Sequence, residues 1–177
     1  CILPMFMTLI GVHYALEDTN IIHWIDFGTL LGAVRGKEVI KHTNDIDLSI
    51  MATNKEDAIM ALEKHMGNTH NINTLDADTG KHQWICVTDK QYPGISLDIA
   101  LRIEHNNKLY DGHISDKNPI NVSDTFPLSQ SEIYGFIFPS PRHTHNVLTN
   151  YYGPNYMIPR RYQSSGQAED DMSNKDS

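Results

Sequence analysis

Residues Trp24 to Ile50 carry the sequence WIDFGTLLGAVRGKEVIKHTNDIDLSI. A Gly-Thr pair, Gly28 and Thr29, precedes a short apolar helix, and two acids, Asp45 and Asp47, follow inside an apolar run. Side chains at positions i and i+2 of a strand point the same way, so the two carboxylates share one face. Two acids held together near a turn that suits anions predict a divalent metal that carries a phosphate. The first hypothesis is therefore a phosphoryl- or nucleotidyl-transfer enzyme.

A third acid has the same placement in a later strand, predicted over residues 95–104. Its apolar face consists of Ile95, Leu97, Ile99 and Leu101. Asp98 falls on the opposite face, with Ser96 and Ala100. If this strand lies beside the one that carries Asp45 and Asp47, three carboxylates converge.

Length and composition predict one ordinary globular domain. The chain has 177 residues, of which 40% are hydrophobic and 20% charged, enough for a sizeable core. We expect the domain to occupy residues 1–163 and a disordered acidic tail to occupy residues 164–177. The net charge of -8 argues against nucleic acid as a partner, because nucleic-acid binding needs a basic surface.

The two cysteines, Cys1 and Cys86, exclude a disulfide framework and a Cys-rich zinc site. Residues 2–12 are apolar, but Pro4 and the short length favour an amphipathic helix over a membrane span. Because the chain begins without Met, we expect a processed form or a fragment. Membrane association through an anchor upstream of Cys1 stays open.

Periodicity and turn residues predict the remaining elements. Thr29 is expected as the N-cap of a helix that Gly36 ends, and residues 68–81 are expected to form a loop. Beyond residue 111 the chain is expected to be irregular apart from one helix. The expected helices are 55–66 and 144–152, and the expected strands are 21–27, 45–51, 82–88, 95–104 and 108–111.

Several residues allow two interpretations. Arg35 is either a phosphate partner or a solvated helix end, and Asp26 either supports the metal site or is exposed. The aromatic residues Tyr151, Tyr152 and Tyr156 either cover a ligand or pack at the end of the domain. The ten histidines show no metal-ligand spacing, so we expect them to be scattered structural or surface residues.

Two motifs resemble one known family. The segment GTLLGAVRGKEVIKHTNDIDLSI is similar to the signature of the LicD/fukutin nucleotidyltransferase-like family, a Gly-Thr-Leu-Leu-Gly-x-x-Arg segment followed by an Asp-x-Asp pair. The segment FPLSQSEIYGFIFPSPRHTHNVLTNYYGPNYMIPRRY resembles the closing segment of that family. The resemblance covers residues 21–162.

The resemblance implies a nucleotidyltransferase-like α/β fold, with a small mixed sheet flanked by helices. It implies a phosphotransferase that moves phosphocholine or an alditol phosphate such as ribitol phosphate from a CDP-linked donor to a glycan, with Mg²⁺ or Mn²⁺ as cofactor. Such an enzyme is expected at the Golgi membrane of a eukaryote or at the cytoplasmic face of a bacterial membrane. Carried over by position, the metal ligands are Asp45, Asp47 and Asp98, and the residues around the donor diphosphate are Gly28, Thr29 and Arg35.

The chain departs from the family pattern just before the acid pair. Many members have Ile-Pro-Trp-Asp-x-Asp-x-Asp, whereas Thr43 stands here in place of the first acid and His42 in place of Trp. Two alternatives therefore remain. One is a non-catalytic relative that binds a glycan or nucleotide, and the other is a nucleotidyltransferase that places NMP on a macromolecule.

Overall fold

The computed structural model describes residues 2–76, 83–112 and 118–159. The predicted acidic tail lies outside these residues. The helices are α1 (Ile2–Asp18), α2 (Phe27–Gly36), α3 (Lys55–Met66), α4 (Val122–Thr125) and α5 (Thr144–Tyr152), with a 3₁₀ turn, η1 (Ala52–Asn54), before α3. The strands are β1 (His23–Ile25), β2 (Asp45–Met51), β3 (His70–Asp76), β4 (Gln83–Asp89), β5 (Ser96–His105), β6 (Lys108–Asp111), β7 (Ile120–Asn121), β8 (Ser129–Ile133) and β9 (Phe136–Ser140).

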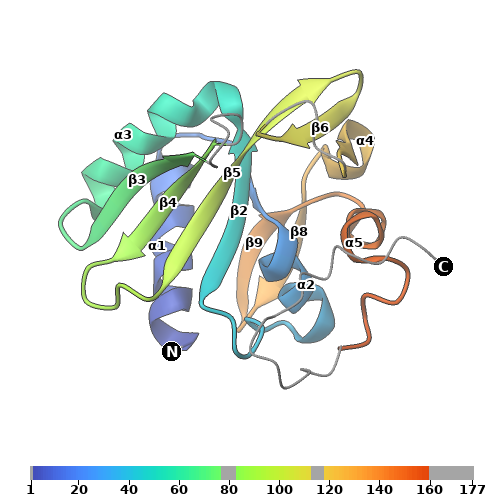
Figure 1. The fold of residues 1–177 in the computed structure, drawn as a ribbon, viewed down its shortest axis with the longest axis horizontal. Coiled ribbons are helices and arrows are strands. Elements are labelled where there is room, and N and C mark those ends of the chain that lie inside the picture. The colour runs from blue at the N-terminus through green and yellow to red at the C-terminus, as the bar shows by residue number, and fades with distance from the viewer. Residues whose placement is uncertain (1, 77–82, 113–117, 160–177) are drawn as a thin grey trace.

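A mixed sheet forms the centre of the molecule (Figure 1). Within the described residues it has seven strands in the order β1-β2-β5-β4-β3, and β6 and β7 continue from β5. β2 and β5 run parallel, while the other neighbouring strands are antiparallel. A separate hairpin pairs β8 with β9. The expected α/β fold with a small mixed sheet flanked by helices is confirmed.

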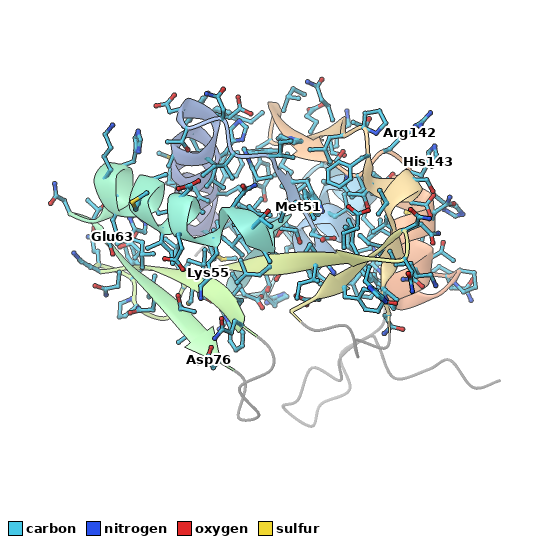
Figure 2. The ribbon with its side chains drawn as sticks, turned by 90° about the horizontal axis from the view of Figure 1, so that it is seen from above. Met51, Lys55, Glu63, Asp76, Arg142 and His143 are labelled. Atoms are coloured by element: carbon cyan, nitrogen blue, oxygen red, sulfur yellow. The ribbon has the colours of Figure 1, made fainter. Side chains whose placement is uncertain are left out.

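Two helices cover one face of the sheet and bury its apolar side chains. Figure 1 shows α1 behind the sheet, and Figure 2 shows α3, labelled at Lys55 and Glu63, alongside β3, labelled at Asp76. The apolar residues of β2, which were expected to point into a core, are at most 1% exposed: Ile46, Leu48 and Ile50. No helix in the described part of the chain is long and apolar enough to cross a membrane.

The predicted elements are confirmed where the apolar pattern is regular. β2, α3 and α5 have the bounds that the sequence predicts. The loop expected over residues 68–81 is wrong in its first half, which forms β3, a sheet-edge strand of mostly exposed side chains. The irregular region expected before α5 is also wrong, because β7, α4 and the β8–β9 hairpin lie there. These short elements carry no periodic pattern long enough to distinguish them from loops.

The start of α2 differs from the prediction as well. β1 ends at Ile25, and Asp26 caps the helix by accepting a hydrogen bond from the Phe27 amide at 3.0 Å. Thr29 is therefore not the N-cap but lies in the first turn. Phe27 adopts φ 42°, a left-handed conformation that bulky side chains rarely occupy. This residue turns the chain abruptly from the strand into the helix.

A buried ion pair fixes that junction to the sheet. Arg102 Nη2 of β5 donates to Asp26 Oδ2 at 2.6 Å, and both side chains are 0% exposed. Ser49 and Trp24 also donate to Asp26 Oδ2, at 2.7 and 3.2 Å. The Tyr151 hydroxyl of α5 accepts from Arg102 at 2.7 Å and donates to Asp26 Oδ1 at 3.1 Å. The network thus joins β1, β2, β5, α2 and α5.

We expect Arg102→Met to destabilise the fold strongly. The substitution leaves Asp26 charged and buried without its partner, which lowers the free energy of unfolding by about 3–5 kcal/mol. Urea denaturation measures the difference. The matched control is Lys37→Gln, which removes the exposed ion pair between Lys37 and Glu132 and should change stability by less than about 1 kcal/mol. A loss in Arg102→Met no larger than in this control would contradict the prediction.

Candidate functional site

The parallel pairing of β2 with β5 brings the predicted acids together. Asp47 is the direct register partner of Asp98, and Asp45 is the partner of Ser96 two residues earlier. The side chains of Asp47 and Asp98 therefore lie next to each other on the face opposite the α1 and α3 layer. Asp45, at the start of β2, is exposed, while Asp47 and Asp98 are partly buried. The expected neighbouring arrangement of the two strands is confirmed.

The first turn of α2 holds Asp47 in place. The Gly28 amide donates to Asp47 Oδ2 at 3.1 Å, and the Thr29 hydroxyl accepts from the Asp47 amide at 2.8 Å. A Cβ atom at Gly28 would lie 3.2 Å from Asp47 Oδ2, so the close approach of the carboxylate favours glycine there. The Gly-Thr pair thus connects the positive end of the helix to the acid of the strand.

The carboxylates repel one another. Burial, followed by the charges of Asp45, Asp26 and Asp98, raises the pKa of Asp47 to about 8, although the Gly28 amide acts in the opposite direction. Burial also raises the pKa of Asp98, an effect that a hydrogen bond with Cys86 partly offsets. At neutral pH the site therefore carries less negative charge than its acids would suggest.

This donor set fits a divalent cation. Among the described residues, Asp98 Oδ1 is buried without a hydrogen-bond partner. An unsatisfied carboxylate oxygen beside a second carboxylate is what a hard cation such as Mg²⁺ would satisfy. Asp45 points part of its carboxylate elsewhere in this structure, because Oδ1 accepts a hydrogen bond from the Thr43 hydroxyl.

A pocket of about 390 Å³ opens beside the acids. Its polar wall contains Asp47, Asp98 and Asp111, and its apolar wall contains Phe27 and Trp84. Such a volume is typical of small-molecule sites, and aromatic rings beside carboxylates suit a ligand with a flat ring and a charged group. A larger hollow of about 550 Å³ lies between β7 and α5, but none of the predicted site residues line it. Its polar wall includes Asp124 and His145.

Sequence reasoning missed three residues of this region, and of its two interpretations of Asp26 the exposed one is wrong. Asp26 is buried in the ion pair rather than exposed, Arg102 is its partner, and Trp84 and Asp111 line the pocket. The detectable signal was Arg102, a cation on the same face as Asp98 in a strand whose opposite face is apolar, where it needs a buried partner. Trp84 and Asp111 are brought to the site by the pairing of β4 and β6 with β5.

Arg35 lies at the far end of α2, in its last turn. Its Nε donates to the Tyr156 carbonyl at 2.6 Å, so it fastens the segment after α5 to the helix. Tyr151 and Tyr156 are buried, which favours the packing interpretation of these aromatic residues. The role of Arg35 at a diphosphate stays a prediction.

The histidines are less scattered than expected. One ligand atom each of His13, Glu17 and His23 lies within 4.8 Å of the other two. Among the described residues, the three acids Asp45, Asp47 and Asp98 are not this close to one another. The group lies on the other face of the sheet, against α1. It could hold a metal ion, and it is separate from the carboxylate site.

Comparisons with known proteins concern the family and the fold. A family model for the LicD/FKTN/FKRP nucleotidyltransferase domain matches residues 20–143. Uncharacterized proteins of Rickettsia prowazekii (strain Madrid E) and Rickettsia typhi (strain ATCC VR-144 / Wilmington) are each 41% identical over 49 residues, which are 28% of this chain. The matched segment spans only 18% and 16% of those relatives.

Solved structures show the same fold. ANT(2")-Ia in complex with adenylyl-2"-tobramycin superposes with a TM-score of 0.57 at 15% identity, covering 86% of this chain and 77% of that one. The lincosamide antibiotic adenylyltransferase LnuA, bound to lincomycin, gives a TM-score of 0.54 at 14% identity, covering 84% and 93%. These likenesses establish the nucleotidyltransferase fold. Because the family model matches most of the chain, the protein belongs to the LicD/FKTN/FKRP nucleotidyltransferase-domain family.

Proposed function

We propose that the protein is a metal-dependent transferase that moves a phosphorylated alcohol from a CDP-linked donor to a glycan hydroxyl. The observation that carries the proposal is the side-by-side placement of Asp47 and Asp98 at an open pocket, next to the first turn of α2. The family membership supports the same chemistry. Phosphocholine and alditol phosphates such as ribitol phosphate are the proposed transferred groups.

The residues of the pocket have different proposed roles. Mg²⁺ or Mn²⁺ held by Asp45, Asp47 and Asp98 would offset the negative charge of the donor diphosphate. Gly28 and Thr29 keep the Asp47 carboxylate and backbone fixed through their hydrogen bonds. We propose that the cytosine ring of the donor binds against the aromatic residues of the pocket, Phe27 and Trp84.

The proposed transfer is a single displacement at phosphorus. The acceptor oxygen forms a bond to the phosphorus next to the alcohol, the bond to the CMP oxygen breaks, and CMP leaves. The proton of the acceptor hydroxyl passes to a carboxylate of the pocket.

A non-catalytic binding role is the second candidate. It is favoured by Thr43, whose hydroxyl engages the carboxylate of Asp45 where many family members place another acid. Metal-independent binding of a CDP-linked donor, without turnover across a donor panel, would support this role.

The third candidate is a nucleotidyltransferase that transfers NMP to a macromolecule. Covalent attachment of label from α-labelled CTP or ATP to an acceptor would identify this activity.

We expect Asp47→Ala to abolish catalysis while leaving the protein folded. Removing one ligand from the metal site should lower Mg²⁺-dependent release of CMP from CDP-choline or CDP-ribitol by at least about 100-fold, because the charge that develops in the transition state is no longer offset. The assay measures CMP in the presence of a glycan acceptor. Asp124→Ala, in the hollow between β7 and α5, is the matched control and should retain activity. Undiminished turnover in Asp47→Ala would refute the assignment.

The raised pKa of Asp47 predicts a pH-dependent loss of stability without metal. An aspartate ionises near pH 4 in the unfolded chain, whereas Asp47 ionises near pH 8 in the folded protein. The folded state therefore binds an extra proton between these values, and the contribution of Asp47 to stability falls as pH rises through this window. We expect Asp47→Asn to be as stable as the natural chain near pH 4 and clearly more stable at pH 8.5, as measured by urea denaturation in EDTA.

Mg²⁺ should reverse this difference. Because the ion competes with the proton on Asp47, 10 mM Mg²⁺ is expected to raise the Tm of the natural chain more at pH 8.5 than at pH 6.5. The Asp47→Asn variant should respond weakly at both values. Equal stability of the natural chain and Asp47→Asn at pH 8.5 in EDTA would contradict the raised pKa of Asp47.

A further inference from the structure

A second group of metal-ligating side chains lies away from the carboxylate site. His13 and Glu17 are one helical turn apart on α1, so both project from the same side of the helix. His23 comes from β1 and pairs in register with Ile50, whose side chain lies in the core under α1. One ligand atom from each of the three residues lies within 4.8 Å of the others.

The hydrogen bond of His23 to the Ile21 carbonyl makes its other ring nitrogen an acceptor. Nδ1 lies 2.8 Å from the Ile21 carbonyl, and since a carbonyl only accepts, Nδ1 carries the proton. Nε2 is then an unprotonated nitrogen with a lone pair. A backbone carbonyl that holds the far nitrogen of a histidine is the usual way in which a metal-binding imidazole is oriented. His23 is 2% exposed, so the orientation is fixed by its surroundings.

His13 points its Nδ1 at this lone pair. The two nitrogens are 2.8 Å apart, close enough to share a single proton. In a tetrahedral zinc site with Zn–N bonds of about 2.0–2.1 Å, two ligand nitrogens lie about 3.3 Å apart. If the partly exposed His13 ring moved by about half an ångström, a zinc ion could replace the proton between the two nitrogens.

The protonation state also suits a metal. Burial lowers the pKa of His13 and of His23, and the charge of Glu17 offsets this in part. Burial thus favours the uncharged imidazole, which is the form that binds metals. Glu17 is exposed and adds a carboxylate on the solvent side of the pair.

We propose that His13, Glu17 and His23 form a zinc site that pins the end of α1 to β1. Two imidazoles and one carboxylate supply three of the four ligands that Zn²⁺ takes, and a water molecule would complete the tetrahedron. The site lies mostly outside the segment that the family model matches, because α1 precedes residue 20. Its role is structural: the ion closes the turn of residues 19–22 and fixes the edge strand against the helix.

The test measures Zn²⁺ binding to the full chain by competition with a chromophoric chelator. We expect one Zn²⁺ per chain with a micromolar or lower Kd, about 10-fold weaker binding in Glu17→Gln and about 100-fold weaker binding in His13→Gln. Both substitutions change partly or fully exposed residues, so the variants should fold, and circular dichroism verifies this. His105→Gln is the matched control, since His105 is exposed at the end of β5.

Two further measurements sharpen the outcome. Stoichiometric Zn²⁺ should raise the Tm of the natural chain and of Asp47→Asn, but not of His13→Gln, because only a ligand of the folded state stabilises it. Binding weaker than about 100 µM in the natural chain would overturn the proposal. Equal affinity in the natural chain, Glu17→Gln and His13→Gln would overturn it as well, since other histidines would then hold the ion.

Discussion

The pairing of Asp26 with Arg102 is the interaction on which the candidate site depends. Two charges removed from water are stable only when each has close partners, and here Ser49, Trp24 and Tyr151 supply them. Burial acts to lower the pKa of Arg102, but Tyr151, Asp26 and Asp111 raise it above the ordinary value, so the guanidinium stays charged. The pair thereby ties together segments that are far apart in sequence.

Asp26 also decides where α2 begins. Asp26 Oδ2 pairs with Arg102, while Asp26 Oδ1 accepts a hydrogen bond from the Phe27 amide. This second bond fixes the strand-to-helix junction. The Arg102 guanidinium lies 4.7 Å from the centre of the Phe27 ring, so the same cation supports the residue with left-handed backbone. With this turn fixed, the next residues, Gly28 and Thr29, reach Asp47. The geometry of the acid site therefore follows from an ion pair that contains none of its predicted ligands.

The alternation of apolar and polar residues was sufficient to predict the strands β2 and β5 and the face on which their acids lie. In β2 and β5 apolar residues recur at every second position and the acids lie between them, which specifies both the strand and the face that carries the acids. The adjacency of Asp47 and Asp98 followed from the assumption that the two polar faces belong to one sheet. Asp26 could not be placed in the same way, because its position depends on Arg102, 76 residues later, and on a conformation of Phe27 that local preferences disfavour. The polar edge strand β3 was missed because its exposed side chains resemble those of a loop.

The two candidate metal sites are chemically distinct and lie on opposite faces of the sheet. Carboxylate oxygens on the open face favour hard cations such as Mg²⁺, whereas imidazole nitrogens under α1 favour Zn²⁺. β1 connects them, because its side chains alternate: His23 faces α1, and the next residue, Trp24, donates a hydrogen bond to Asp26 on the opposite face. An ion that held His23 against α1 would fix this three-residue strand and, through Trp24, the carboxylate that anchors α2. A structural site on the buried face would thus support the placement of Asp47 on the open face without contacting it.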